Sequence, residues 1–153
     1  MIRNNMKSLL SYITESDNRT LKLPDVLYHA TSSHLLSSIK KYGLGGKIPK
    51  RTWWDYDSTE YKNRNQGVFF ATDEYVAASF LEASDDFANF ADEYEDRYDK
   101  SLQIIVFAVN TKDLDISKIS IDSNNSTDED SQTYFYDGII PYNQLTIALK
   151  EDF

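Results

Sequence analysis

The chain has no cysteine, only two histidines, and no apolar run long enough to cross a bilayer. Without cysteine, it cannot form a disulfide, a zinc–thiolate site or a cysteine nucleophile. Two histidines far from any other soft ligand do not make a transition-metal site, so we expect no metal. The first residues lack the apolar core and cleavage site of a signal peptide. We therefore expect a soluble, cytoplasmic protein with no membrane partner.

Positive charge is also scarce. The 16 Lys and Arg side chains are outnumbered by 25 Asp and Glu, which gives a formal net charge of −9. This charge repels a phosphate backbone, so we do not expect a nucleic-acid acceptor. Aromatic residues are plentiful at 14%, and their rings can fill a core or line a cleft. With 153 residues, 41% of them hydrophobic, the chain is sufficient for one domain with its own core.

Residues 26–44 are the most informative stretch. Apolar residues run into a polar group of His, Thr and Ser, and an amphipathic segment then ends at Gly43. This pattern predicts a strand and then a helix, capped by a hydroxyl at 31–33 and closed by Gly43 in the left-handed conformation. His29 would stand where the strand becomes the helix, a rigid and polar place typical of ligand-binding groups. His34 is expected on the surface of that helix.

Hydrophobic periodicity predicts the other elements. Helices are expected over 2–15, 74–81 (capped by Thr72 or Asp73) and 85–99. Strands are expected over 67–72, 102–109, 115–122, 132–137 and 145–149. Strands outnumber helices and the helices come early, which indicates an α+β fold with a mixed or antiparallel sheet. We divide the chain into an N-terminal amphipathic helix, 1–20, and one domain, 21–153.

Three motifs, taken in chain order, resemble the ADP-ribosyltransferase superfamily, in its branch similar to the poly(ADP-ribose) polymerase catalytic domain. Residues 28–31 (Tyr-His-Ala-Thr), continuing to Gly-Leu at 43–44, resemble its aromatic-His-Gly-Ser/Thr strand end and the helix that follows. Residues 67–72 resemble its Gly-hydrophobic-aromatic-Phe-Ala/Thr strand. Residues 132–136 resemble its late strand, which opens with a catalytic acid. The resemblance covers residues 26 to about 147 and implies a split, mixed or antiparallel β-sheet core with flanking helices.

The resemblance implies cleavage of the nicotinamide–ribose bond of NAD, which is a substrate. His29 would hydrogen-bond ribose hydroxyls, the backbone of Ala30 would hold the nicotinamide amide, and Thr31 would add a hydroxyl contact. Phe80 would stack on the nicotinamide ring, with Phe69 as another wall. Departure of nicotinamide leaves an oxocarbenium-like ribose, so such a site needs a clamped ring, a fixed ribose and a nearby anion.

The chain departs from the family pattern at three positions. Ala30 replaces the usual glycine and Phe80 the usual tyrosine; both fit, because these contacts are made by the main chain and by a ring face. Gln132 stands about where the family has its acid, and an amide cannot act as a base. Either Glu129 or Asp130 supplies the catalytic group, or Gln132 only orients the ribose and activity is weak or absent.

The sequence thus predicts a mono-ADP-ribosyltransferase of a small bacterial or phage type, acting on a macromolecule, for which we expect a protein. Two alternatives stay open: an NAD- or ADP-ribose-binding module without turnover, and an enzyme similar to RNA 2′-phosphotransferases. Gln132 favours the first alternative, and the negative net charge disfavours the second. In the plainest interpretation, His29 is a structural histidine and Phe69, Phe80, Tyr134 and Tyr136 are core residues.

Overall fold

The computed structural model describes residues 23–46, 67–122 and 133–153. Its strands are β1 (Val26–Ser32), β2 (Val68–Ala71), β3 (Gln103–Asn110), β4 (Ile119–Ile121), β5 (Thr133–Tyr136) and β6 (Thr146–Asp152). Its α-helices are α2 (Leu36–Tyr42), α4 (Glu74–Glu82) and α5 (Asp85–Tyr98). Short 3-10 turns are η1 (Ser33–Leu35), η3 (Thr111–Asp113), η4 (Ile116–Lys118) and η6 (Tyr142–Gln144). The predicted helix over 2–15, and with it the division at residue 20, lies outside the described residues.

The six described strands form one antiparallel sheet in the order β4-β5-β2-β1-β3-β6. The predicted α+β class is confirmed, and its sheet is antiparallel. β1 pairs with β3 over its whole length, from Val26 opposite Asn110 to Ser32 opposite Ile104. Within the described residues, β1 pairs with β2 only where Tyr28 lies opposite Ala71. We call this narrow junction the β1–β2 seam; it joins a half made of β4, β5 and β2 to a half made of β1, β3 and β6.

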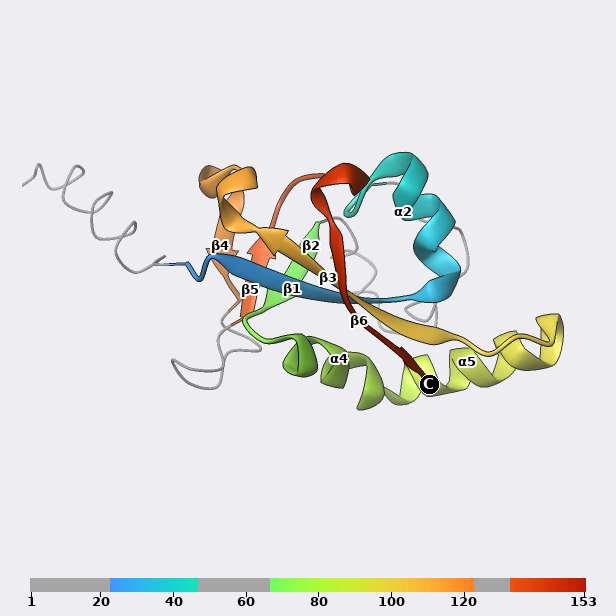
Figure 1. Ribbon diagram of the computed structural model, residues 1–153. Coiled ribbons are helices and arrows are strands. Elements are labelled where there is room, and N and C mark those ends of the chain that lie inside the picture. Colours follow the sequence, from blue (N-terminus) through green and yellow to red (C-terminus); the bar gives the residue numbers. More distant parts are fainter. Residues whose placement is uncertain (1–22, 47–66, 123–132) are drawn as a thin grey trace, which may run out of the picture.

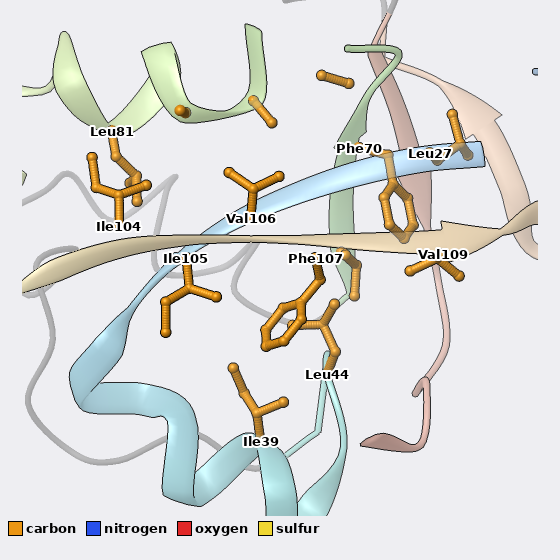
Figure 2. Close-up of a cluster of buried hydrophobic side chains, with 14 of the residues drawn as sticks. Leu27, Ile39, Leu44, Phe70, Leu81, Ile104, Ile105, Val106, Phe107 and Val109 are labelled. Carbon is orange, nitrogen blue, oxygen red and sulfur yellow. The ribbon is translucent and has the colours of Figure 1, made fainter. Parts of the chain in front are cut away.

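The core lies on both faces of the sheet. Figure 1 shows α4 and α5 along one side and α2 on the other. On β3, Ile104 and Val106 point toward α4, whereas Ile105 and Phe107 point toward α2 (Figure 2). All four side chains are fully buried, which explains why β3 is a continuous apolar run without alternation. The predicted strand is present, but it is not central in the sheet, because it lies between β1 and the edge strand β6.

The helices after β2 begin at polar caps. The Asp73 carboxylate accepts hydrogen bonds from the backbone N–H groups of Tyr75 at 2.8 Å and Val76 at 3.1 Å, which confirms the predicted cap of α4. Ser84 caps α5 in the same way by accepting from the N–H of Phe87 at 3.1 Å. α4 buries Ala77, Ala78 and Leu81, and the two small residues let the helix lie close to the sheet. None of the helices in the described ranges has both the length and the apolarity needed to cross a bilayer.

The predicted hydroxyl cap of α2 is wrong. Turn η1 intervenes, and α2 follows Leu35 without a side-chain cap. The Ser33 hydroxyl instead accepts a hydrogen bond from the N–H of Gln103 at 2.9 Å, so it ties η1 to the start of β3. The hydroxyl of Ser32 is hydrogen-bonded to Nδ1 of His34 at 2.6 Å. Both hydroxyls are used by contacts that local sequence does not reveal.

Gly43 does end α2, but in a conformation other than the one predicted. Its φ is +83° and its ψ is 167°, which is outside the left-handed helical region. Leu44 then forms an isolated bridge with Ile140, through backbone hydrogen bonds of 2.8 and 2.9 Å. A Cβ at position 43 would lie 2.8 Å from the carbonyl oxygen of Ile140. Glycine is therefore required both by the positive φ and by this close approach.

Two predicted strands have different bounds. Residues 115–118 do not extend into a strand, because the Asp115 carboxylate accepts from the backbone N–H and the hydroxyl of Ser117 and holds turn η4. Strand β4 therefore begins only at Ile119. The closing strand β6 continues to Asp152, past the predicted end at residue 149, because it pairs with β3 as far as Gln103.

Candidate functional site

His29 does not stand where the strand becomes the helix, as the sequence predicts, because β1 continues to Ser32 through its pairing with β3. It lies immediately after the last pair of the β1–β2 seam. If the ladder continued beyond Tyr28 and Ala71, the backbone of Phe69 would lie opposite Ala30. Instead, Nδ1 of His29 donates a hydrogen bond to the carbonyl oxygen of Phe69 at 2.7 Å. A side-chain N–H thus binds a main-chain acceptor at the point where the two strands separate, and it fixes the imidazole there.

This hydrogen bond determines the protonation of His29. A carbonyl oxygen can only accept, so Nδ1 must carry the proton. Burial lowers the pKa of His29, and the hydrogen bond to Phe69 offsets that effect in part. The imidazole is therefore neutral at physiological pH, and its Nε2 keeps a lone pair. The ring also lies edge-on to Phe70, with centroids 6.2 Å apart at 75°. His29 is thus a positioned acceptor for a hydroxyl group.

Ala30 and Phe69 lie on the face of the sheet that α4 covers. Residues directly opposite in an antiparallel pair point to the same face, and alternate residues of a strand do so too. Ala30 lies opposite Val106, which points toward α4 (Figure 2). Tyr28, two residues before Ala30, lies opposite Ala71, which places Phe69 on this face as well. Ala30 and Phe69 therefore lie on the same face of the sheet, whereas His29, which lies opposite Phe107, is on the face toward α2.

Two phenylalanines of the predicted site differ in their surroundings. Phe69 is half-buried, and its ring centroid lies 4.9 Å from that of Phe135 on β5. Phe80 is 45% exposed, although it lies on α4 among buried neighbours at 77, 78 and 81. An aromatic ring left this open is available for stacking. The plain core interpretation of Phe80 is therefore wrong.

Thr31 lies on the opposite face from Ala30. It pairs with Ile105, which points toward α2 (Figure 2), and its side chain is only 2% exposed. The hydroxyl contact that the resemblance implies for Thr31 has no open surface in the described part of the chain. Tyr134 and Tyr136 on β5 are buried at 3% and 6% exposure, as expected of core residues.

The three residues proposed for the catalytic position, Glu129, Asp130 and Gln132, lie outside the described residues. β5 begins at Thr133, the residue after Gln132 in the sequence, and Thr133 lies opposite Ala71 on β2. The strand that follows the proposed catalytic segment is therefore hydrogen-bonded to the strand that carries Phe69.

His34 is not the surface residue that the sequence predicts. Its ring packs against Phe90 and Tyr94 of α5, with centroids 4.8 and 5.7 Å away. Burial lowers the pKa of His34 to about 4, so its side chain is neutral at physiological pH. The sequence predicts the helix over 85–99 that carries Phe90 and Tyr94, but it does not show that His34 would contact it.

Comparison with protein-family models gives no match for this chain, and comparison with curated proteins gives none either. In the described ranges, no group of three or more His, Asp or Glu side chains is placed to hold a metal ion. The chemistry of the site therefore has to be inferred from its own residues. These offer a neutral histidine acceptor, a nearby aromatic ring on β2 and an open aromatic ring on α4.

Proposed function

We propose that this chain is an NAD-dependent mono-ADP-ribosyltransferase that releases nicotinamide and transfers ADP-ribose to a protein acceptor. The observation that carries the proposal is the hydrogen bond from His29 to the Phe69 carbonyl, which holds a neutral imidazole at the β1–β2 seam. Its Nε2 lone pair suits a ribose hydroxyl donor. The seam itself supports the split sheet that the resemblance implies, because the two halves meet at one pair of residues.

In this reaction the bond between ribose C1′ and the nicotinamide nitrogen breaks, and its electron pair leaves with nicotinamide. The ribose becomes positively charged until an acceptor atom bonds to C1′ and gives up its proton. His29 would hold the ribose from the α2 face of the sheet, and Phe69 and Phe80 would hold the nicotinamide ring on the α4 side of the β1–β2 seam. The segment 129–132 would supply the group beside the developing charge, through Glu129 or Asp130, or through a hydrogen bond from Gln132.

A binding module that holds NAD without turnover is the second candidate. Gln132 favours it, because an amide cannot stabilise a cation as a carboxylate does. The aromatic and histidine groups would serve both candidates equally, so only turnover separates them. An enzyme similar to RNA 2′-phosphotransferases ranks behind both, because a net charge of −9 opposes binding of a phosphorylated RNA.

The test is release of nicotinamide from NAD by the purified protein, alone and with cell lysate, together with transfer of label from adenine-labelled NAD to protein. His29→Asn retains a donor in place of Nδ1 but has no group at Nε2. Phe80→Ala removes the open ring of α4, and Tyr75→Ala removes another exposed ring of the same helix as a matched control. We expect the first two variants to lower release by at least about tenfold, a loss of about 1.4 kcal/mol, and Tyr75→Ala to leave it unchanged.

Variants of the 129–132 segment identify the catalytic group. Loss of release in Glu129→Gln/Asp130→Asn would place the acid at one of these residues, and a gain in Gln132→Glu would place it at position 132. Absence of release, with NAD still raising the thermal unfolding midpoint, would establish the binding module. If NAD is neither cleaved nor bound, both candidates are wrong.

A further inference from the structure

A hollow lies beyond the end of β1, between the start of α2 and helix α5. It is open to solvent, has a volume of about 640 Å³, and is lined by His34 on η1 and by Phe90, Glu93, Tyr94, Asp96 and Tyr98 on α5, among others. We call it the α5 pocket. Its size is in the range of pockets that take a small molecule or a long side chain. None of the residues proposed for NAD binding lines it.

Aromatic rings form one wall of the α5 pocket. Phe90, Tyr94 and Tyr98 follow one another at four-residue intervals on α5, with successive ring centroids 6.2 and 4.7 Å apart. His34 extends this wall, 4.8 Å from Phe90. Because burial keeps its pKa at about 4, His34 adds an aromatic surface but no positive charge at neutral pH. The rings support one another, so the wall is preformed.

Among the described residues that line the α5 pocket, carboxylates outnumber basic side chains. Glu93 and Asp96 contribute two negative charges, and Arg97 contributes one positive charge. The whole of α5 carries six acidic side chains and one basic side chain. A lining with aromatic faces and excess negative charge attracts a cation and repels a phosphate or a carboxylate.

We propose that the α5 pocket binds an arginine side chain of a protein partner. A guanidinium group stacks on aromatic rings and forms paired hydrogen bonds with a carboxylate, so it can use both kinds of lining at once. A lysine ammonium group can use the charge but not the planar stacking, and it is more strongly hydrated. The inference does not depend on the proposed enzyme activity, because binding is measured without NAD.

The test follows the backbone amide and tyrosine ring NMR signals of the full chain during titration with the peptide Gly-Arg-Gly. Gly-Lys-Gly and Gly-Glu-Gly serve as comparison peptides. We expect the arginine peptide to shift the signals of Tyr94, Tyr98 and His34, and to bind more tightly than the lysine peptide. The glutamate peptide is expected to leave these signals unchanged.

Two double variants separate the pocket from the general charge of the helix. Glu93→Gln/Asp96→Asn removes two carboxylates from the lining, whereas Asp92→Asn/Glu95→Gln removes two from α5 outside it. We expect about tenfold weaker binding in the first and less than about twofold in the second, because hydrogen-bonded charge contacts are strong and distant charges are screened. All four positions are exposed, and unchanged unfolding midpoints would show that the fold is intact.

The Arg97→Gln variant best distinguishes a pocket that binds a cation from one that binds an anion. It removes the cation that the described residues contribute to the lining, so it should tighten binding of the arginine peptide; a pocket that takes an anion would respond in the opposite way. Equal weakening by the two double variants would show general charge attraction and would overturn the proposal. So would preference for the glutamate peptide, weaker binding of arginine by Arg97→Gln, or the absence of any shift.

Discussion

The Nδ1 atom of His29 donates to the carbonyl oxygen of Phe69 at 2.7 Å, across 40 residues of sequence. The two nitrogens of this ring therefore have separate tasks. Nδ1 holds the strands together where their main-chain pairing ends, and Nε2 keeps an unprotonated lone pair. The same bond stabilises the fold at this point and orients the group that we propose for ribose binding.

The first prediction concerns the contribution of this bond to stability. His29→Ala should lower the free energy of unfolding by about 1–3 kcal/mol, because it removes the donor to the Phe69 carbonyl and leaves space beside Phe70. His29→Asn should recover part of this loss, since its side-chain amide can donate in place of Nδ1. Urea unfolding at pH 7.5 measures the free energy of unfolding of both variants. Equal stability of the two variants would show that the hydrogen bond contributes nothing.

The second prediction concerns acid. The pKa of His34 is about 4 in the folded protein, against an ordinary value of 6.5. Between these values the unfolded chain binds a proton that the folded chain does not, so stability is lost as pH falls from about 6.5 to about 4. The loss can reach about 3 kcal/mol. It should appear as a falling urea midpoint across this range.

His34→Gln is the control for this acid dependence. Burial also lowers the pKa of His29, which acts in the same direction, so the variant should flatten the pH dependence without abolishing it. NMR titration of the two imidazole rings shows how much of the remaining pH dependence comes from His29. A titration of His34 near its ordinary pKa of 6.5 would contradict the packing against Phe90 and Tyr94.

The third prediction concerns the start of α4, the helix that carries Phe80. Asp73→Ala should cost about 1 kcal/mol of stability, because two backbone N–H groups lose their acceptor. Asp73→Asn should retain most of this stability, because the amide oxygen can still accept from the two N–H groups. Glu74→Ala removes an equal charge from the same turn without removing a cap, so it should cost less. Thermal or urea unfolding of the three variants checks this, and similar losses in Asp73→Ala and Glu74→Ala would mean that charge, not capping, stabilises the helix.

Elements that depend on neighbouring residues could be predicted well. The run before Asp73 and the spacing after it indicated β2 and α4, and the continuous apolar segment 102–109 indicated an interior strand. The aromatic spacing of α5 likewise predicted its helix. One error has a distant cause: Ser33 bonds to the backbone of Gln103 instead of capping α2. Another is local: Asp115 binds Ser117, two residues on, and holds a turn where a strand was expected.

The α+β class and most of the described elements follow from the sequence alone, because periodicity, caps and glycine act within a few residues; His29 was correctly expected on this strand but not within its paired length. Three features depend on the tertiary structure: β1 and β2 pair at a single position, His29 is hydrogen-bonded to Phe69 next to that pair, and His34 packs against α5. These features arise from contacts between residues 40 or more positions apart, and no local pattern specifies which distant segment will meet a given side chain.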